Sequence, residues 1–350
     1  MKPTLAISRL LLAGALAASA AYGADAPVYP NTGGIGDTPQ GADWYQQCLR
    51  VEKAAPPAGD VPAAPVLAAL KACDAQALYY DTRQQPGAGA ADWQRVRHCA
   101  LAQGDDGVLM MLYANGLGVA RHPALALKHA CSLPGAGAEM SGRVAHLIAL
   151  GKSGKAGAFD LCDDITSGYM QGVCTAIDER RQDQTRSKQL GALTRNWSAP
   201  QKAALGKLQA ALDEFARARG ERETDLSGTA RAAMAIAAQS AEISLFGKDV
   251  AAFEKGMTPD FTAAQLAAFD KELNTRYQKI MQLPATRNGG IGAYTTVSKD
   301  QVKQTQRAWL KYRDAFVGFG AARYPALPAR AWQALLTQRR AQQLAQLAAD

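Results

Sequence analysis

The amino-acid sequence predicts an all-α protein. Alanine is abundant and aromatic residues make up only 7% of the chain, a composition that favours helices. Few segments show the alternation of β-branched and polar residues that is typical of strands. The 350 residues are enough for two domains of ordinary size, each able to bury its own hydrophobic core.

Residues 1–23 are predicted to form a secretory signal peptide. Lys2 and Arg9 give the segment a positive start, and an apolar run too short to span a bilayer follows at 10–18. Small residues near 21–23 provide a cleavage site. No cysteine lies there to carry a lipid, and no later apolar run is long enough for a membrane span. We therefore expect a periplasmic or secreted protein.

The next stretch is predicted to be a leader followed by helical hairpins. Residues 24–43 are rich in proline, glycine and polar residues, which favours a flexible leader. A helix is expected at 44–53, a group of prolines then breaks the chain, and a second helix follows at 67–78. The Pro-Gly-Ala-Gly run at 86–89 breaks it again. These hairpins begin a cysteine-rich helical region that we place at 44–178.

All cysteines of the chain lie in this region. An even number of cysteines in an exported chain indicates a disulfide framework, although the sequence leaves the pairing open. Pairing of nearest neighbours is the favoured hypothesis, because short loops close most easily. The alternative role for the cysteines, metal binding, is not favoured, because the sequence contains no Cys-x-x-Cys pair. The expected pairs are Cys48 with Cys73, Cys99 with Cys131, and Cys162 with Cys174.

One helical pair in the same region carries a recognisable pattern. Leu112 and Tyr113 near the end of a helix are followed by Gly116 and Gly118, whose backbones can take the left-handed conformations of a tight turn. A second helix starts at Pro123. This pattern resembles a Sel-like repeat, a short relative of the tetratricopeptide repeat. The resemblance implies a protein-binding scaffold, with a degraded second copy near 147–157 that the disulfides help to support.

Charge is distributed unevenly along the chain. Residues 24–175 contain 11 Lys and Arg against 14 Asp and Glu, a net charge of −3, whereas residues 176–350 contain 26 against 17, a net charge of +9. The basic half is compatible with an anionic partner. Nucleic acid is a poor physiological partner for an exported protein, so we do not expect it.

The basic half, residues 179–350, contains a weak internal duplication. Ser198 and Ser298 each open a helix with a capping box, and the apolar positions after them correspond when the chain is shifted by about one hundred residues. The proposed copies span 195–250 and 262–348. The second copy begins with a helix that carries Leu273 and Tyr277 on its apolar face.

The helix after Ser298 is the most clearly defined in the chain. Val302, Thr305, Trp309, Tyr312 and Phe316 recur at spacings of three and four, which places them on one helical face. We expect the aromatic residues of this face to form the core together with the apolar residues of the preceding helix.

Three sequence blocks in this half carry a resemblance to a known family. They are DKELNTRY at 270–277, QRAWLKYRD at 306–314 and LTQRR at 336–340. In this order they resemble the lysozyme-inhibitor LprI-type domain, a small helical domain of the cell envelope. The resemblance implies a helical bundle that captures or inhibits a lysozyme-like muramidase. Members of the family carry cysteines near these blocks, whereas no cysteine follows Cys174 here.

The candidate partner-binding residues are charged and lie in the last two blocks. We expect Arg313 and Asp314 to form ion pairs with the helix that contains Asp270 and Glu272, or to contact a partner. The cations near them are expected on a solvated face that is able to meet a partner. The candidate residues are Arg307, Lys311, Arg313, Asp314, Arg339 and Arg340.

No catalytic motif is present in the sequence. There is no serine elbow, no catalytic cysteine context and no pair of glutamates, and the four histidines show no ligand or triad spacing. We therefore expect neither a cofactor nor a metal. The favoured hypothesis is an exported, non-enzymatic binding protein whose partner is a lysozyme-like muramidase. The alternative is an envelope scaffold that binds another exported protein or an anionic envelope polymer.

Overall fold

The computed structural model confirms the all-α class. It describes residues 28–33, 35, 39–70, 72–153, 158–284 and 286–347. Within these ranges the regular elements are helices, and the only β pairing is an isolated bridge between Gly290 and Ser298. None of the helices in these ranges is long and apolar enough to cross a membrane. The predicted signal peptide lies outside the described residues.

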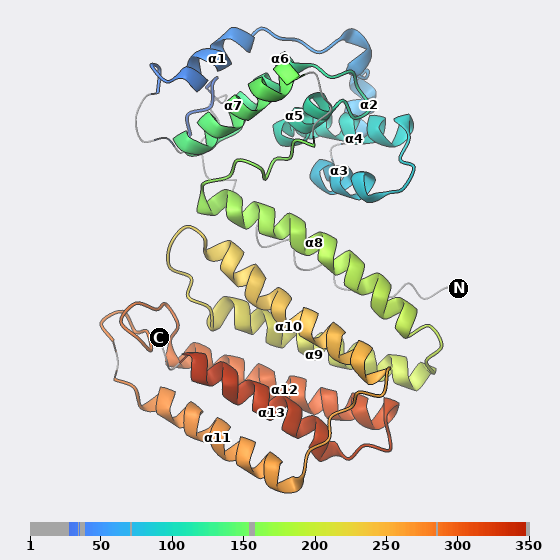
Figure 1. Cartoon of the computed structure of the whole chain (residues 1–350), viewed down its shortest axis with the longest axis vertical. Coiled ribbons are helices and arrows are strands. Elements are labelled where there is room, and N and C mark those ends of the chain that lie inside the picture. The colour runs from blue at the N-terminus through green and yellow to red at the C-terminus, as the bar shows by residue number, and fades with distance from the viewer. Residues whose placement is uncertain are drawn as a thin grey trace. The chain divides into compact units, whose positions relative to one another are not determined.

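The chain divides into two compact units, Met1–Met170 and Gln171–Asp350, which we describe separately. The helices of the first unit are short (Figure 1). They are α1 (Asp43–Val51), α2 (Ala64–Ala69), α3 (Ala75–Gln84), α4 (Ala90–Gln103), α5 (Asp106–Asn115), α6 (Pro123–Ser132) and α7 (Gly137–Ser153), with the 3₁₀ turn η2 (Ala58–Asp60) between α1 and α2. Asp74 and Asp105 cap α3 and α5 by accepting backbone N–H groups of the first turns.

Helix α5 is the centre of the first unit. All but its first and last residues are buried, and it packs against α6, α4 and α7. The turn after α5 has the predicted conformation, with φ of +71° at Gly116 and +68° at Gly118. A Cβ atom at Gly118 would lie 2.3 Å from the Cβ of Trp93, so only glycine fits there. Assignment of this helical pair to the Sel-like family stays a prediction.

The disulfide pattern corrects the nearest-neighbour hypothesis. Cys48 pairs with Cys131, at a sequence separation of 83, and Cys73 pairs with Cys99, at a separation of 26. The prediction of Cys48 with Cys73 and Cys99 with Cys131 was wrong because α1, which carries Cys48, packs against α6, which carries Cys131. Cys162 and Cys174 are also disulfide-bonded.

The predicted leader, residues 24–43, is described only in part. Tyr29 donates a hydrogen bond to the backbone oxygen of Cys48, 3.0 Å away. The Asn31 side chain donates to the backbone oxygen of Ser132 at 2.9 Å, and its backbone N–H donates to the oxygen of Cys131 at 2.8 Å. These residues are therefore held against both ends of the Cys48–Cys131 bridge.

The second unit is a bundle of long helices (Figure 1). Ser198 and Ser298 form the predicted capping boxes that open α9 and α12, and a further capping box at Thr262 opens α11. Helix α9 packs against α10 and α12, and α13 packs against α11 and α12. The helices are α8 (Gly168–Leu193), which begins just before this unit, α9 (Ala199–Arg222), α10 (Arg231–Phe253), α11 (Ala263–Gln282), α12 (Lys299–Arg323) and α13 (Ala329–Leu347).

The core of the second unit is built around the apolar face of α12. Trp309, Tyr312 and Phe316 are buried there, together with Leu273 of α11, and Tyr277 packs partly buried against them. Trp332 of α13 is fully buried beside Phe316. Its indole lies so close to α12 that a Cβ at Gly320 would be 2.3 Å from the ring nitrogen. The α12–α13 contact therefore depends on that glycine. The internal duplication stays a proposal.

Candidate functional site

Arg340, one of the candidate partner-binding residues, is fully buried. Its side chain has 0% exposure and forms a two-point ion pair with Glu223, which is also 0% exposed. The two hydrogen bonds measure 2.8 Å from Nη1 to Oε2 and 2.6 Å from Nη2 to Oε1. Arg340 Nε donates to Gln306 Oε1 at 2.8 Å. The expectation that Arg340 lies on a solvated face is wrong, because its carboxylate partner draws it into the bundle.

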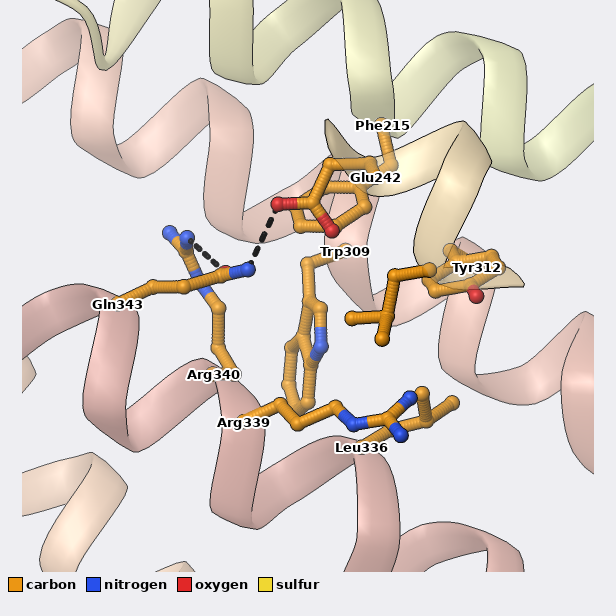
Figure 2. Close-up of a pocket in the computed structure, with 9 residues that line it drawn as sticks. Phe215, Glu242, Trp309, Tyr312, Leu336, Arg339, Arg340 and Gln343 are labelled. Carbon is orange, nitrogen blue, oxygen red and sulfur yellow. Dashed lines mark hydrogen bonds between the residues drawn. The ribbon is translucent and has the colours of Figure 1, made fainter. Parts of the chain in front are cut away.

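The Arg340–Glu223 pair belongs to a larger polar network. Arg219 donates to Glu223 at 2.8 Å and to Glu242 at 3.3 Å, and Gln343 donates to Glu242 at 2.8 Å. Figure 2 shows the path from Arg340 through Gln343 to Glu242. Burial raises the pKa of Glu242 above its ordinary value, and the nearby arginines oppose this shift. The network joins α9, α10, α12 and α13.

Arg339 of α13 makes a second ion pair, which joins this helix to α10. Both of its terminal nitrogens donate to the carboxylate of Asp249 on α10, with one contact at 2.8 Å. Trp309, Tyr312 and Leu336 line a pocket together with Arg339 and Arg340, as Figure 2 shows. They leave a cavity of only about 10 Å³, close to the space of one water molecule. The arrangement is therefore a framework that holds helices together, and it is too small for a ligand.

Arg313 and Asp314 pair with each other. Arg313 Nη2 lies 3.2 Å from Asp314 Oδ1, and its guanidinium stacks over the ring of Trp309, 5.2 Å from the centroid. Helix α11, which carries the expected partners Asp270 and Glu272, packs against α13. Glu272 of α11 pairs instead with Arg276 of the same helix, at 3.7 Å. The expectation of an α11–α12 ion pair was therefore wrong.

The outer side of α12 carries a line of cations. Lys299, Lys303, Arg307 and Lys311 follow one another at spacings of four, so each lies next to the following one on the helix surface. We call these four residues the α12 cationic face. Lys311 pairs with Glu214 of α9 at 2.7 Å, and both side chains are largely exposed. Lys303 and Arg307 are exposed and make no ion pair with the described residues.

Two histidines of the first unit have acidic partners that the sequence analysis did not anticipate. His129 Nδ1 lies 2.7 Å from Asp106, and His146 Nδ1 lies 2.9 Å from Asp164. Neither pair has a third ligand, since the described residues contain no group of three or more His, Cys, Asp or Glu that could hold a metal ion. These pairs connect helices and loops of the first unit and do not form a recognisable site.

The pattern of burial separates the sequence blocks into two kinds of residue. Gln306, Trp309, Tyr312 and Arg340 face the interior, where they fix α12 against α9 and α13. Arg307, Lys311 and Asp314 of the same blocks face solvent.

Residues 252–347 match the family model of lysozyme inhibitor LprI. The match covers α11, α12 and α13 and includes all three blocks. Comparisons with curated proteins and with solved structures give no match. LprI is described as an inhibitor, which is consistent with a binding role for this part of the chain and gives no support to catalysis.

The LprI-like segment is completed by residues that precede it. Glu223, which neutralises the buried Arg340, lies in the connection after α9, and Glu242 and Asp249 lie on α10. All three precede residue 252. Because a buried guanidinium without its carboxylate is strongly destabilising, α9 and α10 are part of the folded unit that contains the LprI-like segment. No local pattern in the sequence indicates this dependence.

Proposed function

We propose that the second unit is a protein-binding module that captures and inhibits a lysozyme-like muramidase. The match of residues 252–347 to the lysozyme inhibitor family carries this proposal. The geometry supports it, because the arginine network fixes four helices and leaves Lys303, Arg307 and Lys311 of the α12 cationic face exposed. A surface that is rigid before binding loses little conformational entropy when a partner docks.

The charge of the unit bears on the kind of contact expected. Glycoside hydrolases of the lysozyme type act with a pair of carboxyl groups in the substrate cleft. The exposed guanidinium of Arg307 and ammonium of Lys303 are suited to that acidic cleft, even when the enzyme as a whole is basic. Long-range repulsion between two basic proteins is screened beyond about 8 Å at physiological ionic strength. Inhibition of a basic muramidase should therefore be preserved or strengthened at physiological salt.

The disulfide bonds support a proposal for the cellular location. Disulfide bonds are typical of proteins that fold in an oxidising compartment, and this chain contains the Cys48–Cys131 and Cys73–Cys99 bridges. A muramidase partner is also found outside the cytoplasm. We therefore propose that the protein acts in the periplasm or after secretion, following removal of residues 1–23.

The direct test is inhibition of muramidase activity by the oxidised chain that begins at residue 24. Increasing amounts of the protein are added to muramidases of different net charge, at low and at physiological ionic strength. Stoichiometric inhibition is expected for at least one enzyme at physiological salt. Absence of inhibition for every enzyme under both conditions would refute the proposed function.

A matched pair of charge variants locates the contact. The double variant Lys303→Glu/Arg307→Glu reverses two exposed cations of α12, and the control Lys271→Glu/Lys279→Glu reverses two exposed lysines of α11. Both change the net charge equally. Loss of inhibition in the α12 variant alone supports the α12 cationic face as the contact. If the protein instead bound an anionic polymer through its overall charge, both variants would weaken binding and salt would abolish it steeply.

A further inference from the structure

The connection between α11 and α12 is a built loop. We call residues 286–297 the α11–α12 loop. Residues 291–297 form a closed turn within it, because Ile291 N–H donates to the oxygen of Val297 at 2.8 Å, next to the bridge between Gly290 and Ser298. Ile291 and Val297 are buried in the core of the bundle. The base of the loop is thus fixed by backbone pairing and by apolar side chains.

The tight path of the loop requires glycine at its first corner. A Cβ at Gly290 would lie 2.3 Å from the backbone oxygen of Thr295 across the loop. Thr286 adds a further constraint, because its hydroxyl donates to the oxygen of Gly290 at 2.8 Å. The two sides of the loop therefore lie close together at this point, and the residues between 291 and 295 project away from the bundle.

A second anchor comes from the connection between α9 and α10. Asp225 accepts hydrogen bonds from the backbone N–H and from the hydroxyl of Thr296, both at 3.1 Å. The Thr296 hydroxyl accepts in turn from Leu226 N–H at 2.8 Å. Hydrogen bonds from Ser227 and Thr296 lower the pKa of Asp225 to about 2, so this carboxylate is ionised at physiological pH.

These anchors present one aromatic side chain to solvent. Tyr294 has 94% of its surface exposed, and it lies between the two fixed positions Ile291 and Thr296. A large aromatic ring on a pre-ordered loop is an efficient binding element, because it contributes contact area at a low cost in conformational entropy. Lys299 follows in the first turn of α12, so the α12 cationic face begins beside the loop.

We propose that the α11–α12 loop enters the carbohydrate-binding cleft of the muramidase, with Tyr294 as its anchor. This inference rests on the proposed function and names its contact residue. A convex loop is complementary to a concave cleft, and a tyrosine offers both an apolar face and a hydroxyl that can replace a sugar hydroxyl. Lys299 and Lys303 follow the loop on α12, where their charges are complementary to the carboxyl groups of such a cleft.

The test compares two exposed tyrosines in the oxidised chain that begins at residue 24. Tyr294→Ala removes the proposed anchor, and Tyr169→Ala is the control, because Tyr169 is 69% exposed and lies in α8. Inhibition of a muramidase that the unaltered protein inhibits is titrated for each variant. Tyr294→Ala is expected to weaken inhibition by about 30-fold, the effect typical of an interface hot spot. Tyr169→Ala is expected to leave it unchanged.

The outcomes distinguish this inference from the proposed function. Inhibition by Tyr294→Ala equal to that of the unaltered protein would overturn the role of the loop and leave the proposed function standing. Equal weakening by both variants would also overturn it, because it would indicate a general effect of removing surface tyrosines. A protein that inhibits no muramidase even without substitution refutes both. Melting curves of the variants, expected to match that of the unaltered chain, exclude loss of fold as the cause.

Discussion

Arg340 and Glu223 form an ion pair in which neither side chain has any solvent exposure. The two residues are 117 positions apart in the sequence, and they join the last helix of the LprI-like segment to the end of α9. Taking two charges out of water is costly unless each is fully paired. Here Gln306, Gln343 and Arg219 supply the remaining hydrogen bonds. The bundle therefore depends on all of these partners being present together.

Replacement of Glu223 tests this dependence. Glu223→Ala leaves the guanidinium of Arg340 buried without its partner, which should lower the free energy of unfolding by about 3–5 kcal/mol. The exposed pair between Glu214 and Lys311 provides the control, and Glu214→Ala should cost about 1 kcal/mol or less. Calorimetry of the oxidised chain measures both. Equal effects of the two substitutions would contradict a special role for the buried pair.

The same pair predicts which fragment of the chain folds. A fragment of residues 252–350 contains the whole LprI-like segment but lacks Glu223, Glu242 and Asp249. We expect it to lack a cooperative unfolding transition. A fragment of residues 171–350, which corresponds to the second unit, should unfold cooperatively. Circular dichroism during thermal unfolding compares the two, and a cooperative transition in the shorter fragment would show that the arginine network is dispensable.

The disulfides of the first unit are expected to contribute unequally. Cys48–Cys131 closes a loop of 83 residues and Cys73–Cys99 one of 26. In the chain-entropy description a longer loop constrains the unfolded chain more, which corresponds to about 4.5 against about 3.5 kcal/mol. Double Cys→Ser variants of each bridge should therefore lower the transition of the first unit by different amounts. The transition of the second unit is the internal control, and the opposite order of the two variants would contradict the expectation.

Local signals in the sequence were sufficient for most of the helices. The capping boxes at Ser198, Thr262 and Ser298 are complete within four residues each, and all three open helices. The apolar face of α12 is likewise a local pattern, and Trp309 and Phe316 are buried as that pattern implies. Helix starts and apolar faces are decided by neighbouring residues, so they can be read without knowing the tertiary structure.

Features that depend on distant residues were not accessible in this way. Arg339 and Arg340 are adjacent and look alike in the sequence, yet Arg340 is buried because Glu223 lies opposite it. The pairing of Cys48 with Cys131 depends on the packing of α1 against α6. Thr296, two residues after the exposed Tyr294, is held by a hydrogen bond to Asp225. In each case the deciding partner is more than 60 residues away.

Trp309 allows the core of the second unit to be tested independently of its charges. The side chain is only 2% exposed, so Trp309→Ala should lower the free energy of unfolding by about 3–5 kcal/mol through lost burial and the cavity left behind. Leu310 is the adjacent control, because it is partly exposed and Leu310→Ala should cost much less. Denaturant unfolding measures both variants. An unchanged midpoint for Trp309→Ala would place this residue on the surface and favour a direct role in binding.

The anchor of the α11–α12 loop gives a prediction for pH. The pKa of Asp225 is about 2 in the folded protein, below its ordinary value of 3.8. Because the folded pKa is depressed, the stabilising contribution of this carboxylate is present above pH 3.8 and is lost as the pH falls through about 2. The backbone N–H of Thr296 donates to this carboxylate, so its NMR chemical shift should titrate with a midpoint near 2. In Asp225→Asn the titration should disappear, and a midpoint near 4 in the unaltered chain would show that Thr296 is not held by Asp225.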